Sequence, residues 1–466
     1  MTRPNDAPTG GPPLPPAGCP AHAAPVRLAS GDMLGDLSGL YEKWRTAHGP
    51  VVPIELDGGV PAWLVIGHNA LREVCRPHAP FSSDSRQWNE LRAGRVSDEW
   101  PLLPQIAYQE GNTRFLSGTA HKRLRSLLSS GLNQADGVMT RRYAEWVADR
   151  LIGRVAQSGR ADVVSDYAAP LPLLVMLRLL GLAHETGEQL LPAIFRLLEG
   201  GAEARSAHEE INTILGRLVT ARRAAPERDL VSWLLHGPVE GEPLSDLEVR
   251  NLSWLTVMAG AGGTTGWISN VMEQLVRGQE LHSLYLAGKA TIPEIMNATH
   301  RLNPAVQNVM GRFPLRDVPA GELGRYPIPA GALMVLGLAG ASADPQANGG
   351  GHGSHLGNEY HFAFGAGAHE CPTAAQRLAN IITETAVDRF LYRCRSLGLE
   401  DGQAVQWGGS VILRQLSSLR VRFTSAGRAE ERNDTVSGTA LGDSSRSSHS
   451  LFPPSMLTAL TAHASR

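Results

Sequence analysis

The chain has 466 residues, of which 42% are hydrophobic and 19% are charged, and its 43 basic residues nearly balance its 45 acidic ones. This length suits either two or three average domains or one large fold with a sizeable core. A net charge of −2 excludes a general electrostatic grip on nucleic acid or on an anionic membrane. The four cysteines, Cys19, Cys75, Cys371 and Cys394, form no C-x-x-C pair and are too few for a disulfide framework, so a reducing cytoplasm is expected.

The pattern along the chain predicts one folded body between two polar ends. Residues 1–25 are rich in proline and lack both the apolar stretch of a signal peptide and the length of a membrane anchor, so a disordered leader is predicted. Residues 425–466 are rich in serine, glycine and charge and predict a flexible C-terminal tail. The body between them, 26–424, shows no internal repeat and is predicted to be a single large domain.

Apolar residues in the body recur mostly at helical spacing. The longest apolar run, 168–182, is short for a membrane span and carries Arg178, so it predicts a buried helix in a soluble protein. Four further segments predict helices: 121–132, 139–156, 244–263 and 374–394. The strand-like segments are shorter: 51–56, 62–67, 332–338 and 419–423. The fold class predicted from these patterns is mainly α with a small β portion.

The segment FAFGAGAHECPTAAQRLA, residues 362–379, places a cysteine at the start of a predicted helix. Gly365 and Gly367 allow tight backbone geometry before it. Pro372 suits the first turn of the helix, whose N-terminus would stabilise a thiolate at Cys371. These features fit an iron–thiolate site, and they also fit a glycine-rich loop around a buried thiol. A zinc site is disfavoured because the chain has no P-C-x-x-C partner and no second ligand pair at zinc spacing.

The same segment resembles the heme-binding loop of cytochromes P450, F-G-x-G-x-H-x-C-x-G. The matching residues are Phe364, Gly365, Gly367, His369 and Cys371. Thr373 departs from this pattern, since the family usually has glycine there. The resemblance implies that the protein binds heme b (iron protoporphyrin IX) with Cys371 as the iron ligand and Phe364 covering one side.

Distant segments extend the resemblance to most of the body. His121 and Arg125 are four residues apart on one predicted helix face and are similar to the family's H-x-x-x-R pair, which binds a heme propionate. Arg312 stands where a second propionate-binding arginine is expected, and His369 is implied as a further propionate ligand. The similarity runs in order from about residue 30 to 424, which implies the cytochrome P450 fold.

Two family motifs are altered. The E-x-x-R motif is replaced by Ala298-Thr299-His300-Arg301, so Arg301 lacks the usual glutamate. A buried Arg301 without that partner would cost several kcal/mol, and His300, Glu294 or a backbone carbonyl is expected to compensate. The following loop, 345–361, also lacks the arginine that the family places there, so a rebuilt network is predicted.

The second altered motif lies in 258–270, which is similar to the family's oxygen-activating helix A-G-x-[DE]-T-T. Gly263 replaces the acid, whereas Thr264 keeps the alcohol. In the family these two groups relay protons to dioxygen, so both positions are predicted to be catalytic. Glycine also permits close packing of this helix on the heme, and both roles are compatible.

The resemblance implies a heme-thiolate monooxygenase or oxidase that acts on a small organic molecule of secondary metabolism, by C–H hydroxylation or oxidative coupling. Its electrons are expected from a separate ferredoxin and ferredoxin reductase, in the cytoplasm. Residues 84–112, with Trp88, Trp100 and Tyr108, either contact an aromatic substrate or pack over the heme. The alternative function is a degenerate helper that binds and activates a partner enzyme, which the two altered motifs favour and the intact cysteine loop opposes.

Overall fold

The structure is a computed structural model that describes residues 25–28, 35, 37–199, 203–237, 242–277, 280–348, 359–400 and 405–425. The predicted leader and the predicted tail lie outside the described residues except for their inner ends, residues 25 and 425. Most of the loop 345–361 also lies outside them.

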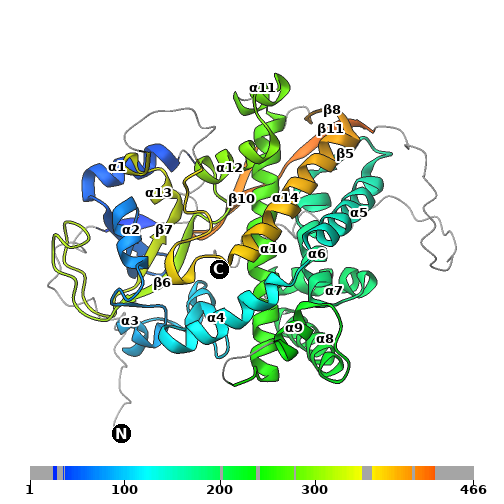
Figure 1. Cartoon of the computed structure of the whole chain (residues 1–466). Helices are drawn as coiled ribbons and strands as arrows, with labels where there is room; N and C mark the ends of the chain where they lie inside the picture. The colour runs from blue at the N-terminus through cyan, green and yellow to red at the C-terminus, as the bar shows by residue number, and fades with distance from the viewer. Residues whose placement is uncertain are drawn as a thin grey trace, which may run out of the picture.

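Helices form most of the described chain, and one of them organises the rest. Helix α10 (Asp246–Val276) begins with a capping box between Ser245 and Glu248, and residues 264–276 are all buried. Because a helix surrounded on all sides belongs in a core, α10 runs through the middle of the molecule, with the largest sheet on one side and α5 to α9 on the other (Figure 1). The other helices are α1 (Leu37–His48), α2 (His68–Cys75), α3 (Asn89–Arg92), α4 (Gly118–Asn133), α5 (Gly137–Val155), α6 (Pro170–Leu180), α7 (His184–Glu199), α8 (Ala204–Ala224), α9 (Leu230–His236), α11 (Glu280–Leu286), α12 (Ile292–Leu302), α13 (Leu338–Ser342) and α14 (Thr373–Arg393).

The strands of the described chain form three sheets. The largest has the order β1-β2-β3-β7-β6-β4, and the smaller ones are β10-β9 and β5-β11-β8. Strands β2 and β3 form an antiparallel hairpin, whereas β3 and β7 are parallel. The strands are β1 (Val26–Leu28), β2 (Val51–Leu56), β3 (Val60–Val65), β4 (Phe81–Ser82), β5 (Arg160–Asp162), β6 (Asn308–Pro314), β7 (Met334–Gly337), β8 (Cys394–Leu399), β9 (Gln406–Gly409), β10 (Arg414–Ser418) and β11 (Arg420–Ser425).

The predicted mainly α fold with a small β portion is confirmed, as is the single large domain. The buried helix predicted within 168–182 is α6. By length and composition, one described helical segment, Val163–Leu180, could cross a membrane, and 83% of it is buried inside the protein, which is typical of a core helix. The predicted strand 332–338 is wrong at its end, because helix α13 begins at Leu338.

Candidate active site

The cysteine loop is a tight turn that leads into α14. The Cys371 N–H donates to the Phe364 carbonyl at 2.8 Å, and the Gly365 N–H donates to the Phe362 carbonyl at 2.7 Å. The side-chain amide of Gln376, in the first turn of α14, donates to the Cys371 carbonyl at 2.8 Å. The backbone of the half-buried Cys371 is therefore held by hydrogen bonds through both its N–H and its carbonyl. Burial raises the pKa of the Cys371 thiol to about 11, and the charge of Arg125 opposes that rise.

Two glycines of the loop have left-handed backbone conformations, with φ of +80° at Gly365 and +68° at Gly367. A Cβ atom on Gly367 would lie 1.9 Å from the carbonyl oxygen of Cys75, at the end of α2. A Cβ atom on Gly365 would have no neighbour closer than 3.6 Å. The loop therefore lies directly on the α2 backbone at Gly367 only.

This difference predicts unequal effects of two alanine substitutions. Gly365→Ala is expected to cost about 1–2 kcal/mol of unfolding free energy, the penalty for a left-handed non-glycine residue. Gly367→Ala is expected to cost clearly more, because the loop must also move away from α2. Urea unfolding of both variants measures the two costs. Equal costs would contradict the close packing at Gly367.

Basic side chains gather beside the cysteine loop from separate parts of the chain. His121 and Arg125 come from α4, Arg312 comes from β6, and His369 comes from the loop itself. The rings of His121 and His369 lie 4.0 Å apart at an interplanar angle of 31°. The Nε2 atom of His369 lies 3.0 Å from the Ser83 hydroxyl. The structure thus brings these four predicted residues to one place.

A β-bulge aims Arg312 into this cluster. Strand β6 pairs with β7 with a register shift between Met310 and Arg312, and the intervening Gly311 has φ of +91°. Such a bulge bends the strand and redirects a side chain. Arg312 is only 7% exposed, and its guanidinium donates to the Gly311 carbonyl at 3.1 Å.

Sequence reasoning missed one member of the cluster, Arg114, which lies in the turn Thr113–Phe115 just before α4. The half-buried Arg114 donates to the Gln105 side chain at 3.3 Å. Burial, followed by the nearby charge of Arg312, lowers its pKa to about 10. The only sequence signal was an arginine beside apolar residues seven positions before His121.

These five residues form what we call the cationic cluster: Arg114, His121, Arg125, Arg312 and His369. Within the described chain, none of them forms an ion pair with an aspartate or glutamate, and Arg125 donates instead to the backbone carbonyl of Glu370. The buried Nε2 atom of His121 also lacks a hydrogen-bond partner there. The three arginines are the cations of the cluster, and because buried cations are normally paired, the cluster is suited to an anion.

The pKa values of the histidines show the same imbalance of charge. Burial, followed by the charges of Arg125 and Arg312, lowers the pKa of His121 to about 4. Burial, followed by Arg312, His121 and Arg125, lowers the pKa of His369 to about 2. A carboxylate placed here would raise both pKa values and so oppose these shifts. The thiol and the cationic cluster therefore fit heme, a flat iron-containing group that carries two carboxylates. The thiol suits the iron, and the cluster suits the carboxylates.

Helix α10 is continuous through its glycines near the predicted catalytic pair. The Thr264 hydroxyl donates to the Gly260 carbonyl at 2.6 Å, and Thr264 is 3% exposed. A Cβ atom on Gly263 would meet only the Val306 side chain, at an ordinary 3.5 Å. A Cβ atom on Gly266 would lie 2.7 Å from Ala305. The packing around α10 therefore leaves room for an acid at position 263, whereas it requires glycine at position 266.

The altered E-x-x-R region is built differently from what the sequence suggested. Arg301 is half-buried, so the expected cost of a fully buried charge is an overestimate, although burial still lowers its pKa. Glu294 does not compensate for the lost glutamate, because its carboxylate caps α12 at Thr291. Ala298 is fully buried, and His300 is stacked on Trp267 with ring centroids 3.7 Å apart.

The aromatic residues of 84–112 mostly serve the core. Trp88 and Trp100 are 0% and 5% exposed, and their rings lie 5.8 Å apart. The Trp100 indole donates to the Asp57 carbonyl at 2.7 Å. Tyr108 is half-buried, with the Arg86 guanidinium 3.9 Å above its ring. Core packing therefore accounts for both tryptophans.

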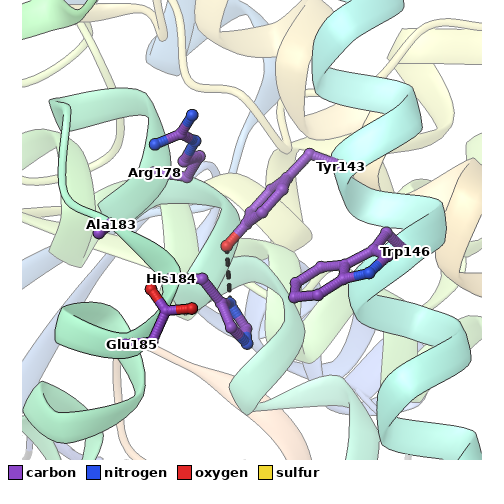
Figure 2. A pocket seen from close by; sticks show the side chains of 6 residues that line it. All are labelled: Tyr143, Trp146, Arg178, Ala183, His184 and Glu185. Carbon is purple, nitrogen blue, oxygen red and sulfur yellow. Dashed lines mark hydrogen bonds between the residues drawn. The ribbon is translucent and has the colours of Figure 1, made fainter. Parts of the chain in front are cut away.

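Other parts of the described chain offer weaker candidates. Its residues contain no group of three or more His, Cys, Asp or Glu side chains that could hold a metal ion. A cavity of about 350 Å³ opens between α5 and the start of α7 (Figure 2), where the Tyr143 hydroxyl lies 2.9 Å from His184. None of the predicted site residues lines it. A second cavity, of about 660 Å³, lies beside the cysteine loop and α2.

Comparison with known proteins gives consistent relatives. No protein-family model matches the chain. The cytochrome P450 monooxygenase PikC of Streptomyces venezuelae is 26% identical over 415 residues, 86% of this chain and 94% of PikC. The cyclomarin C epoxidase CymV of Salinispora arenicola is 29% identical over 370 residues, 72% of this chain and 92% of CymV. The solved structure of CYP154C4 from Streptomyces sp. ATCC 11861 has 26% identity and a TM-score of 0.73, and the match covers 86% of this chain and 98% of that one.

Proposed function

This chain belongs to the cytochrome P450 superfamily and is a P450-type oxidase, and we propose that it binds heme b through Cys371 and oxidises a small organic molecule of secondary metabolism. The observation that carries the proposal is the unpaired cationic cluster beside an accessible loop thiol. The names of its relatives support the substrate class, since they include an epoxidase of cyclomarin C and the polyketide biosynthesis cytochrome P450 PksS of Bacillus subtilis.

Each residue of the site has a role in this proposal. Cys371 would bind the iron, and Gly365 and Phe364 would shape the loop around it. The cationic cluster would hold the two propionates through charge-assisted hydrogen bonds. When bound, heme supplies the reductive chemistry of dioxygen, and the protein orients the substrate and controls the supply of protons.

Proton supply is where this chain differs from its family. Thr264 keeps a hydroxyl on α10, but that hydroxyl donates to the Gly260 carbonyl, and Gly263 offers no acid. We propose that Thr264 exchanges this bond for a water molecule during turnover, since an alcohol both donates and accepts. Slow proton supply is compatible with hydroxylation and with oxidative coupling. Turnover under ¹⁸O₂ separates them, because only hydroxylation places the label in the product.

Restoring the acid tests this account. Gly263→Asp is expected to fold with a change in stability within about 0.5 kcal/mol, because the Cβ has room and Asp is no worse than glycine in a helix. A positioned general acid contributes about 10²–10⁴-fold, so the reduced protein is expected to return to its oxidised spectrum in air about tenfold faster or more. The control is Gly262→Asp, whose Cβ meets nothing within 4 Å. An equal effect of both variants would contradict the assignment of position 263.

We propose a separate ferredoxin and ferredoxin reductase as electron donors and the cytoplasm as the location. Turnover with NAD(P)H that requires both added proteins would support the first part. The helper function is the second candidate, since Ala298 and Gly263 stand where the family has a glutamate and an acid. The cationic cluster disfavours it, because a protein that uses only the fold gains nothing from keeping buried cations without carboxylates.

The decisive experiment is the visible spectrum of the purified protein, reduced and treated with carbon monoxide. The expected result is the strongly red-shifted Soret band of a thiolate-ligated heme. Protein that shows no Soret band after expression with ample heme would overturn the proposed enzyme and would favour the helper.

A further inference from the structure

Four aromatic rings lie together beside the cysteine loop, around His300 of the altered E-x-x-R motif. Trp267 comes from α10, His300 from α12, and His361 and Phe364 from the loop region. The Trp267 and His300 rings are stacked, with centroids 3.7 Å apart at 23°. The His300 ring meets Phe364 at 4.9 Å and 74°, edge to face, and His361 at 4.8 Å. We call these four residues the ring cluster.

The ring cluster is fixed to the helical core. The Trp267 indole donates to the Met296 carbonyl at 3.0 Å, which joins α10 to α12. Trp267 and His300 are 2% and 5% exposed. Neither ring nitrogen of His300 has a hydrogen-bond partner among the described residues. Burial holds the pKa of His300 well below its usual range, and His361 adds to this effect. His300 is therefore a neutral aromatic ring that contributes by stacking and not by charge.

The His300 ring is connected to Cys371 through Phe364. The His300 ring supports the edge of Phe364, and Trp267 meets the same ring at 5.9 Å and 84°. The carbonyl of Phe364 accepts the N–H of Cys371 at 2.8 Å. A displacement of Phe364 therefore moves a direct hydrogen-bond partner of Cys371. Aromatic pairs prefer such edge-to-face geometry, so the contact favours one orientation of the Phe364 ring.

We infer that His300 is a positioning residue for Cys371, and that its stack on Trp267 holds Phe364 in place. The inference deepens the proposed function and rests on it for the iron ligand, but the positioning itself concerns only this chain's own residues. The His300 ring contacts Phe364, and the Phe364 carbonyl accepts a hydrogen bond from the Cys371 N–H. His300 therefore acts on Cys371 through Phe364.

The test uses two variants. His300→Ala removes the aromatic ring, whereas His300→Phe keeps a flat ring and removes the two ring nitrogens that have no hydrogen-bond partner among the described residues. Hydrogen exchange of the full-length protein, read by mass spectrometry on the peptide that contains 362–371, is expected to be at least tenfold faster in His300→Ala. His300→Phe is expected to stay within about twofold of the unsubstituted protein, because stacking is restored. In the reduced, CO-treated protein, His300→Ala is expected to lose part of the red-shifted Soret band and His300→Phe to keep it.

His184→Ala is the matched control. His184 is also a mostly buried histidine, with its ring 4.4 Å from Trp146, but it lies in the remote cavity of Figure 2. It is expected to leave exchange at 362–371 unchanged. If His300→Ala does not fold, His300→Leu keeps the volume without the flat ring and is expected to show the same faster exchange.

The outcomes separate the positioning role from the proposed function. Exchange and spectrum of His300→Ala that match the unsubstituted protein would overturn the inference and leave the proposed function intact. Faster exchange of the same size in His184→Ala would also overturn it, because the effect would then be general loosening. A missing Soret band in the unsubstituted protein would overturn the proposed function, whereas the exchange data would still decide whether His300 holds the loop.

Discussion

Replacing Cys371 with alanine is expected to abolish the red-shifted Soret band of the reduced, CO-treated protein completely, whereas Cys394→Ala and Cys75→Ala are expected to keep it. Iron–thiolate ligation needs a sulfur that is accessible from one side and carried by a loop of fixed geometry. Cys371 is half-buried at the end of a hydrogen-bonded turn and meets both conditions. Without a thiolate, any remaining heme would show the unshifted band, and heme retention would fall.

The other two described cysteines are matched controls because both are buried thiols. Cys394 is 2% exposed at the end of α14, and burial raises its pKa to about 12. Cys75 is the stricter control, since its carbonyl lies against Gly367 and its pKa is raised by burial despite the charge of Arg312. Loss of the band in Cys75→Ala with retention in Cys371→Ala would place the iron on Cys75 and would contradict the assignment of Cys371.

The cysteine loop could be predicted from sequence because its determinants are local. Gly365 and Gly367 adopt positive φ as the pattern indicates, and α14 begins at Thr373, with Pro372 as its N-cap and not in its first turn. The spacing of His121 and Arg125 on one helix is also local information. Such residues are placed by their neighbours in the chain, so a short motif is sufficient.

Other parts of the site depend on contacts between distant segments. The direction of Arg312 is set by the bulge at Gly311, which exists only where β6 pairs with β7. Arg114 enters the cationic cluster through a turn whose position depends on the whole region before α4. The stack of Trp267 and His300 joins α10 to α12, so the sequence indicated a rebuilt network with His300 as a candidate member but did not indicate Trp267.

Strands β5 and β8 could not be predicted from the sequence, for a similar reason. Strand β5 pairs with β11, in one sheet with β8, although it lies more than 200 residues before both, and β5 and β8 have exposed positions without clear alternation. Their pairing is decided by tertiary contacts and not by local propensity. The predicted helix 374–394 therefore ran one residue too far, into Cys394, where β8 begins.

The unpaired cationic cluster leads to a prediction in which one substitution has opposite effects in two forms of the protein. Arg312→Gln is expected to leave the heme-free protein equally stable or more stable, because it removes a buried charge that has no carboxylate partner among the described residues. In the heme-loaded protein it is expected to remove a charge-assisted hydrogen bond worth about 1.5–3 kcal/mol. At about 1.4 kcal/mol per factor of ten, heme affinity is expected to fall about 10- to 100-fold.

The measurement is urea unfolding of the heme-free and heme-loaded forms, together with the rate of heme transfer to an acceptor protein. The control is Arg316→Gln, four residues along the same segment, where the arginine is exposed and pairs with Glu322 at 2.6 Å. A surface pair of this kind contributes about 0–1 kcal/mol, so Arg316→Gln is expected to change both forms slightly and equally. Equal destabilisation of both forms by Arg312→Gln would show instead that Arg312 stabilises the fold. A loss confined to the heme-loaded form shows that the buried charge is kept for the bound carboxylates, since ligand binding to the native state alone accounts for the difference.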